Sequence, residues 1–335
     1  MKKLTINEIA EMVGVSKTTI SFYLNGKTNK MSDETQKKIQ QVIEETGYTP
    51  SAATRTVKAS DDCIGVILGD VSKPFAAKAL KGIEEEAHEA GYQVIVGNNE
   101  MSFAKEKEYV EHMLKMGVSG FIIQATYRFG ILAMELEKKN KKIIYLDIPP
   151  YDSQGVRVLG DNYQCVYDAI SQCIERGYDQ LLVVSDANES EYTGMDNLRG
   201  FKDAANDAGV SFKTYFIEAE TTREEIHDYL EQIISEYKKT LVYASDVEAL
   251  RKVYLGIKLF PDFQSLFPER LGLIGFDVTG WTKIAVPEIS AIMIPAYQEG
   301  QIASRKLIEM IESKNSISNK KVIIKNAVRW RDSTL

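Results

Sequence analysis

Acidic and amide side chains end a series of strand-length apolar runs from Cys63 onward. They are Asp70, Asn98, Asn99, Gln124, Asp147, Asp186, Asp246 and Asp277. Each side-chain oxygen can accept a hydrogen bond from a hydroxyl group, and Phe75 or Trp281 can stack on an apolar ring face. The set predicts a site for a small polyhydroxylated ligand. Asp and Asn also cap helices at such junctions, and for any single residue both roles stay open.

A second polar set lies near the N-terminus, in the stretch KTTISFYLNG. On a helix, one arc of this stretch carries Lys17, Thr18, Ser21, Phe22 and Asn25, while Ile20, Tyr23 and Leu24 lie opposite. A small polar surface of this kind fits the major groove of DNA. The Phe22 ring cannot donate to guanine as an arginine would, but it can contact a thymine methyl group. Packing against Met31 or the next helix is the alternative.

Residues for common catalytic chemistry are scarce. The chain has no G-x-S-x-G, no P-loop and no G-x-G-x-x-G after a strand. Its histidines, in charged helical surroundings, are His88, His112 and His227. Its cysteines, without metal-ligand spacing, are Cys63, Cys165 and Cys173. We therefore expect neither an enzyme nor a bound metal or cofactor.

Three short helices are predicted to position the N-terminal polar set. Thr5 and Glu8 form a capping box, so a first helix starts at Ile6, and its apolar stripe stops at Gly14. A second helix from 17 to about 24 is capped by Ser16. A third is capped by Ser32 and ends at 47. The tight turn between the first two indicates a helix-turn-helix, with a generic helical hairpin as the alternative.

The stretch SAATRTVKASDD, residues 51–62, has no strong apolar stripe and should be marginal as a helix alone. It is a candidate for folding only against DNA and a partner strand. Arg55 and Lys58 would then lie near phosphates, and Val57 would be an apolar wedge in the minor groove. A flexible tether fits the composition equally well.

From Cys63 onward, strand-length apolar runs alternate with amphipathic stretches, and the pattern restarts once, near residue 179. Runs buried on both faces with helical crossovers predict parallel sheets, and two successive sets predict two doubly wound lobes facing each other. The fold class is therefore a small all-α head plus an α/β body. Ligands of such sheets bind at the carboxyl ends of the strands, where the acidic and amide side chains lie.

Length and charge fit this division. A chain of 335 residues with 44% hydrophobic residues suggests two or three domains. Residues 1–60 contain nine Lys or Arg against six Asp or Glu, whereas the remainder is acidic. The N-terminal head is therefore basic although the whole chain has a net charge of −7. No apolar run reaches the roughly 18 residues that span a bilayer, and the N-terminus does not look like a signal peptide. We expect a cytoplasmic protein that does not bind membranes.

The motifs together resemble the LacI/GalR family of bacterial transcription regulators over the whole chain. The resemblance is carried by TINEIAEMVGVSKTTIS, by MSDETQKKIQQVIEETGYTP, by IGVILGDVSKPFAAKALKGIEEEAHEAGYQVIVGNN and by VPEISAIMIPAYQEGQIASRKLIEMI. It implies a repressor that binds double-stranded operator DNA as a homodimer, with a small-molecule effector, a sugar or sugar acid, held between lobes like those of type I periplasmic binding proteins. A sugar-binding protein without a regulatory role is the alternative.

The resemblance also implies boundaries and contacts. The head would span 1–50, the hinge 51–61 and the core 62–335, with a first lobe at about 62–160 and 291–320 and a second at about 161–290 and 321–335. DNA contacts would fall on Thr5, Ser16, Lys17, Thr18, Thr19, Ser21, Phe22, Asn25, Thr35, Ser51, Thr54, Arg55 and Val57. Effector contacts would fall on Asp70, Phe75, Ala76, Gln124, Asp147, Asn197, Asp246 and Asp277.

Several residues depart from the family's usual pattern. Phe22 stands where most members have arginine, and Val57 replaces the usual hinge leucine. Asn197 replaces an arginine that commonly holds the effector, and Ile294 replaces a common glutamine. Without the guanidinium, a carboxylate or a pair of hydroxyls loses a bidentate partner. The stretch KTTISFYLNGK with the following MS, and the pair Trp281-Thr282 after GFD, resemble repressors of ketodeoxygluconate and related sugar-acid regulons, but Asn197 argues against that assignment.

Overall fold

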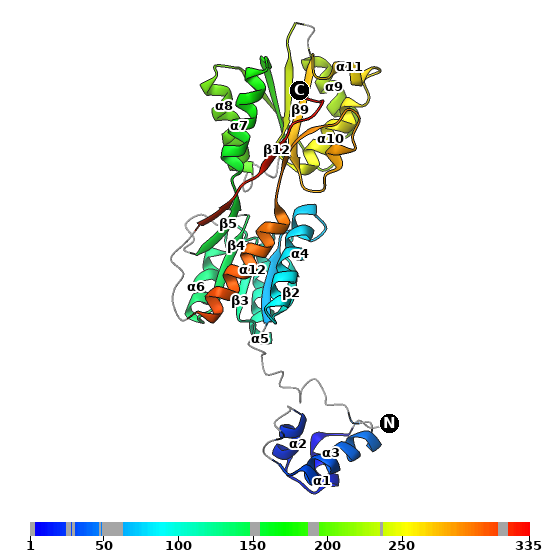
Figure 1. Ribbon diagram of the computed structural model, residues 1–335, viewed down its shortest axis with the longest axis vertical. Helices are drawn as coiled ribbons and strands as arrows, with labels where there is room; N and C mark the ends of the chain where they lie inside the picture. The colour runs from blue at the N-terminus through cyan, green and yellow to red at the C-terminus, as the bar shows by residue number, and fades with distance from the viewer. Residues whose placement is uncertain are drawn as a thin grey trace. The chain divides into compact units, whose positions relative to one another are not determined.

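The structure, a computed structural model, describes residues 4–24, 28, 31–46, 48, 63–147, 155–186, 194–234, 237–313 and 321–335. The chain divides into two compact units, Met1–Ser60 and Asp61–Leu335. Figure 1 labels many of the helices and strands of both units. Among the predicted contacts, Asn25, Ser51, Thr54, Arg55 and Val57 lie outside the described residues.

The first unit contains α1 (Ile6–Val13), α2 (Lys17–Leu24) and α3 (Asp33–Thr46). The predicted capping box is present, with the Thr5 backbone N–H donating to Glu8 Oε2 at 2.6 Å. Gly14 ends α1 in the left-handed region at φ 77°, where a side chain would be strained. Ile6, Ile9, Ala10, Ile20, Ile39 and Tyr48 form the buried core of this unit. The predicted three-helix head is therefore confirmed.

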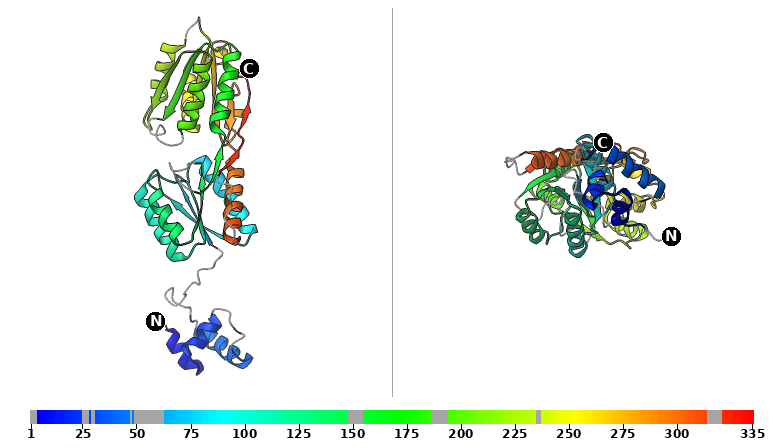
Figure 2. Two further views of the ribbon diagram at one scale, coloured as in Figure 1. Left: turned by 90° about the vertical axis from the view of Figure 1, so that its left-hand side faces the viewer. Right: turned by 90° about the horizontal axis from the view of Figure 1, so that it is seen from below.

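The second unit contains two lobes, each built on a six-stranded sheet with helices on both faces (Figure 2). The first sheet has the strand order β11-β5-β4-β3-β1-β2. Its strands are β1 (Cys63–Leu68), β2 (Gln93–Asn98), β3 (Gly120–Ile123), β4 (Lys142–Leu146), β5 (Val156–Gly160) and β11 (Lys321–Ile324). One face is covered by α4 (Pro74–Glu89) and α12 (Ala296–Glu312), the other by α5 (Phe103–Met116) and α6 (Gly130–Lys138).

The second sheet has the order β12-β10-β9-β8-β6-β7. Its strands are β6 (Gln180–Asp186), β7 (Phe212–Ile217), β8 (Thr240–Ala244), β9 (Leu271–Asp277), β10 (Ser290–Met293) and β12 (Ala327–Arg329). One face packs on α7 (Asn162–Glu175) and α8 (Gly194–Asp207) and the other on α9 (Arg223–Ile233) and α10 (Val247–Ile257). Helix α11 (Phe263–Leu266) and the 3₁₀ turn η3 (Trp281–Lys283) are short. Of the pairings in the described residues, only β10 with β12 is antiparallel.

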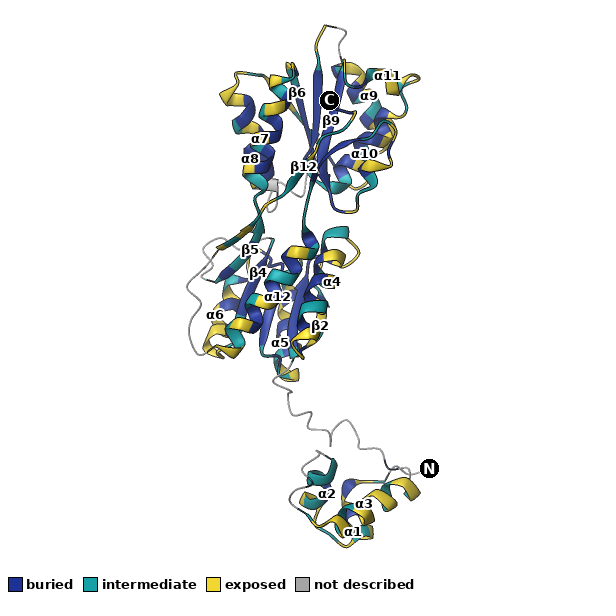
Figure 3. Cartoon of the chain, in the orientation of Figure 1, coloured by how far each residue is buried: buried dark blue, intermediate teal, exposed yellow. Residues whose placement is uncertain are grey.

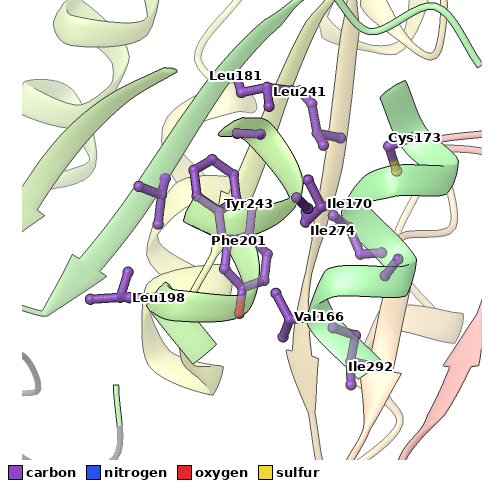
Figure 4. Packing of buried hydrophobic residues seen from close by; sticks show 14 of the residues in the cluster. Val166, Ile170, Cys173, Leu181, Leu198, Phe201, Leu241, Tyr243, Ile274 and Ile292 are labelled. Carbon is purple, nitrogen blue, oxygen red and sulfur yellow. The ribbon is translucent and has the colours of Figure 1, made fainter. Parts of the chain in front are cut away.

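Strand alternation distributes the apolar side chains between the two layers. Leu181 and Val183 enter the cluster under α7 and α8, whereas Leu182 and Val184 enter the cluster under α9 and α10. In the first cluster Phe201 stacks on Tyr243 with ring centroids 5.4 Å apart (Figure 4). Figure 3 shows the resulting buried strands between helices whose outer faces are exposed. The predicted pair of doubly wound lobes is confirmed.

The lobe boundaries need one correction. The chain crosses between lobes three times, after β5, after β10 and after β11. Strand β10 pairs with β9 of the second sheet, and β11 pairs with β5 of the first. The predicted first-lobe segment 291–320 therefore shifts to begin after 293 and to include β11. An apolar run near the C-terminus does not by itself reveal which sheet edge it joins.

These crossings place the carboxyl edges of both sheets at the junction of the lobes. Strand β5 ends at Gly160 just before α7 of the second lobe, and β10 ends at Met293 just before α12 of the first. In addition, the Lys78 ammonium of α4 donates to the backbone oxygen of Val278, which follows β9. Residues that follow the strands are thus brought to a common region of the second unit.

Candidate DNA-binding and effector sites

Helix α2 turns its predicted contact residues away from the head core. Lys17 and Thr18 are exposed, Thr19, Ser21 and Phe22 are half-buried, and Ile20 is fully buried. Tyr23, Leu24 and Met31 pack against the head core. The Phe22 side chain is half-buried and keeps surface that a base could contact.

Three predicted DNA contacts take part in the capping of helix N-termini. Ser16 Oγ accepts from the Thr19 backbone N–H at 3.1 Å, which caps α2. The Thr35 backbone N–H donates to Ser32 Oγ at 3.3 Å, which caps α3. Thr5 caps α1 in the same way. Helix N-termini are favourable places for phosphate groups, so capping and backbone contact are compatible roles.

In the first lobe, Gln124 connects the ends of three strands. Its Oε1 accepts from the backbone N–H of Gly69 at 3.0 Å, and its Nε2 lies 3.5 Å from Asp147 Oδ2. Asp70 Oδ1 accepts from the Ser72 hydroxyl at 2.7 Å and from its backbone N–H at 2.9 Å. The hydroxyl bond is the main reason why the pKa of Asp70 is lowered.

Asp147 is the most unusual of the predicted effector residues. It follows β4 in the left-handed region at φ 62°, which is uncommon for a residue with a side chain. Burial raises its pKa to about 6, against the weaker opposite effect of the Gln124 amide. Strained backbone and a perturbed carboxyl group at one position are typical of functional residues.

Phe75 and Ala76 occupy the first turn of α4, which follows β1. Ala76 is fully buried and belongs to the core of the first lobe, whereas Phe75 is half-buried and packs against that core. Only Phe75 therefore has side-chain surface available for a ligand in this structure.

In the second lobe, Asn197 of α8 donates from Nδ2 to the backbone oxygen of Ser245 at 3.0 Å, next to the end of β8. Its Oδ1 is buried and accepts no hydrogen bond from the residues that the structure describes. Asp246 uses Oδ1 to cap α10, accepting from the backbone N–H groups of Glu248 at 2.9 Å and Ala249 at 2.8 Å. Asp246 therefore caps a helix, which is the role that the sequence left open beside ligand binding.

Asp277 is fully buried and accepts five hydrogen bonds from Thr279, Gly280 and Thr282. Burial alone would raise its pKa, but these bonds, led by the Thr282 hydroxyl, hold the pKa below its usual value. The bonds favour a role in holding the loop after β9 over direct contact with an effector.

Other residues of the strand-end set also hold loops. Asn98 Oδ1 accepts from the Val71 backbone N–H at 3.0 Å. Asn99 is fully buried and donates to the backbone oxygen of Gln124 at 3.2 Å. Trp281 packs near Tyr254, with ring centroids 5.5 Å apart. Several members of the predicted effector set thus form hydrogen bonds within loops, and the set as a whole stays a prediction.

Comparison with known proteins gives the family. A model described as bacterial regulatory proteins, lacI family, matches residues 5–51, and one described as periplasmic binding proteins and sugar binding domain of LacI family matches residues 61–330. The chain belongs to the LacI family. It is therefore a DNA-binding transcription regulator, as its head predicted.

Individual members are distant relatives of this LacI-family chain. Catabolite control protein A of Priestia megaterium is 27% identical, over 99% of each chain. The regulator KdgR of Bacillus subtilis strain 168 is 26% identical, over 92% of this chain and 91% of its own. A LacI-family regulator from Enterococcus faecium, solved with bound ribose, shares the fold at a TM-score of 0.68 and 20% identity, over 81% of this chain and 98% of its own.

Within the described ranges, no three His, Cys, Asp or Glu side chains are grouped so that they could hold a metal ion. No helix in the described part of this LacI-family chain is long and apolar enough to cross a bilayer.

One residue of the junction was missed in the sequence. Glu299 lies in the first turn of α12 and is 1% exposed, and both its carboxyl oxygens are buried without a hydrogen-bond partner in the described part of the chain. Burial is the main reason why its pKa is raised well above the usual value, and the nearby Asp147 and Asp161 add to the effect. The burial of Glu299 could have been predicted from its position, because it falls on the apolar stripe of α12 with Ala296, Ala303 and Leu307.

Proposed function

We propose that this regulator is a repressor whose affinity for its operator is controlled by a small metabolite, a sugar or sugar acid, bound between the two lobes of the body. The main support for a bound effector is Asp147, which follows a strand at the lobe junction. Its backbone is left-handed, and its carboxyl group, beside Gln124, has a raised pKa. Bound ribose in the Enterococcus faecium relative supports the ligand class.

For DNA, the proposal assigns base contacts to the outer surface of α2 and phosphate contacts to the capped helix ends. The residues that we assign are Thr5, Ser16, Lys17, Thr18, Thr19, Ser21, Phe22 and Thr35. The hinge residues 51–61 would fold against the minor groove, with Val57 as the wedge. A homodimer would present two heads to a pseudo-palindromic operator, in the cytoplasm, where that DNA lies.

Control by the metabolite is a linkage effect. A ligand can change operator affinity only by binding one arrangement of the protein more tightly than the other, and DNA must change ligand affinity by the same factor. The body would thus bind its ligand without transforming it.

A gel shift with the DNA upstream of the protein's own gene, repeated at several salt concentrations and with candidate metabolites, tests the proposal. We expect one local site to bind at least a hundredfold more tightly than competitor DNA, with affinity that falls as salt rises. Binding no tighter than competitor DNA would contradict the operator part. Operator affinity that no sugar or sugar acid changes would contradict the effector part.

A further inference from the structure

Glu106 is a buried acidic side chain in the first lobe. It lies in the first turn of α5 and is fully buried, on the same inner stripe of the helix as Val110 and Met113. Those two neighbours are apolar, and a buried acid is costly unless its oxygens are satisfied. The partners of Glu106 therefore indicate what this position does.

No salt bridge within the described residues neutralises Glu106. Lys105, beside it in the chain, pairs with Glu100 at 2.5 Å, and the Lys107 ammonium lies 3.8 Å from Glu111. Burial is the main reason why the pKa of Glu106 is raised, and the hydrogen bonds that it accepts act in the opposite direction. The carboxyl group is thus held by hydrogen bonds rather than by a cation.

Donors from two loops bond this carboxyl group. Thr126 donates its backbone N–H to Glu106 Oε1 at 2.8 Å and its hydroxyl to Oε2 at 2.5 Å. Asn99 Nδ2 donates to Oε1 at 3.2 Å and to the backbone oxygen of Gln124 at 3.2 Å. Asn99 follows β2 and Thr126 follows β3, so Glu106 ties together the ends of the two strands that flank β1.

The same bonds hold Gln124 from two sides. Asn99 fixes its backbone oxygen, and Thr126 fixes the chain two residues later. The Gln124 side chain then reaches the end of β1, where Oε1 accepts from the Gly69 backbone N–H at 3.0 Å. Its Nε2 faces Asp147 Oδ2 at 3.5 Å. Both ends of the amide are therefore aimed by a backbone that is anchored on both sides.

Asn99 also holds a strained turn beside Gly69. The next two residues, Glu100 and Met101, are left-handed at φ 48° and 53°. Asn99 Oδ1 accepts from the Met101 backbone N–H at 3.0 Å. A Cβ added to Gly69 would lie 3.0 Å from the Met101 sulfur and 3.7 Å from Gln124 Oε1. Left-handed residues with side chains persist where surrounding contacts impose them, often at functional sites.

We propose that Glu106 is a positioning residue of the effector site, which fixes the Gln124 amide through Asn99 and Thr126. This inference rests on the proposed function and adds a residue that acts without contacting the ligand. A ligand that meets an amide already held in place loses less free energy in ordering it, so binding is tighter.

Amide hydrogen exchange of the full-length protein without ligand, read at single residues, tests this role. In Glu106→Leu the Gly69 amide should exchange about tenfold faster, because Gln124 loses its support. The amides of residues 64–68 should change less than about threefold, because strand pairing holds them. Glu106→Gln keeps an acceptor oxygen at the same place and should restore Gly69 exchange to within about threefold of wild type.

Ser290→Ala is the matched control, because it removes a buried hydroxyl, 2.6 Å from that of Thr334, in the second lobe. It should lower stability without selectively faster exchange at Gly69. Thr126→Val removes one hydroxyl bond to Glu106 and should accelerate Gly69 exchange about threefold, which decides the matter if Glu106→Leu does not fold. Exchange at Gly69 that is unchanged in the folded variants, or that matches Ser290→Ala, would overturn the inference.

The pH profile of Asp147 is a second readout, which a loss of overall stability would not move. The Gln124 amide lowers the pKa of Asp147, so a displaced amide should let that pKa rise further. Compared with its Asp147→Asn partner, Glu106→Leu should keep the stability contribution of Asp147 to a pH about 0.5 units higher than wild type does. Glu299 and Asp161, two other acidic groups at the junction, are the same in all four proteins. An end point that does not move, or moves down, would overturn the inference.

Both readouts use protein without ligand, so they fail independently of the proposed function. If no sugar or sugar acid changes operator affinity, the proposed effector is overturned, and with it the purpose of the Gln124 placement. If the exchange or the pH profile fails while a sugar changes operator affinity, only the role of Glu106 is overturned.

Discussion

At the scale of single residues, Phe22 and Asp147 show how one side chain can set specificity. Phe22 lies half-buried on α2, next to Tyr23 and Leu24, which pack against the head core. Both Asp147 and Asp277 follow strands, but among the described residues Asp277 accepts five hydrogen bonds from its own loop, whereas Asp147 has one contact, to Gln124. Similar residue types at similar places thus take different roles according to their hydrogen-bond partners.

Replacing Phe22 with Arg should change base preference at one operator position toward G, because a guanidinium can donate to guanine O6 and N7. We expect a preference of about 1 to 3 kcal/mol for G over T at that position, measured by selection from a random operator library. Phe22→Leu, which keeps an apolar contact for a thymine methyl, is the control and should retain the original preference. An unchanged preference in Phe22→Arg would assign the ring to packing.

Asp147 should make stability depend on pH. Its pKa is raised from 3.8 to about 6, so its favourable contribution is fully present below pH 3.8 and is lost as pH rises through about 6. Relative to Asp147→Asn, the wild-type protein should lose about 1 to 3 kcal/mol of unfolding free energy between pH 4 and pH 7. Denaturant titrations of both proteins across that range measure the difference, and two parallel pH profiles would contradict the prediction.

At the scale of elements, the α4–α12 crossing shows why helices of this lobe need small residues at defined turns. Gly300→Ala should destabilise the body by about 3 kcal/mol, because its Cβ would overlap the Ala79 backbone oxygen. Gly130→Ala, at the start of α6 with nothing within 4 Å of its Cβ, is the matched control and should be neutral or slightly stabilising. Thermal melts of the two variants check this, and equal melting points would show that the crossing can relax.

At the scale of the whole molecule, charge is divided between an acidic body and a basic head that carries nine Lys or Arg. Removal of a phosphate contact should therefore change how DNA binding depends on salt. Lys17→Ala should lower the slope of log affinity against log salt by about 0.9. Lys38→Ala removes the same charge from an exposed pair with Glu34, 3.0 Å away on α3, and should change the slope less. Equal slopes in both variants would assign no specific contact to Lys17.

Much of this protein could be predicted from its sequence because the signals are local. The capping box of Thr5 and Glu8, the left-handed Gly14 and the strand alternation that buries Leu181 and Leu182 in opposite layers depend on neighbours a few residues apart. The strand ends also followed from the apolar runs. The hydrogen bonds that Asp277 accepts also come from residues at most five positions away, although this loop was not predicted from the sequence.

The sequence by itself therefore determined the helix-turn-helix head and the two doubly wound lobes, and it predicted the sheet edge where we propose that a ligand binds. Only the tertiary structure decided that β11 joins the first sheet and that Glu299 lies buried near Asp147. The physical reason is distance along the chain. Burial and unpaired hydrogen-bond acceptors arise from contacts between segments far apart in sequence, such as α12 against α4, and no local pattern records them.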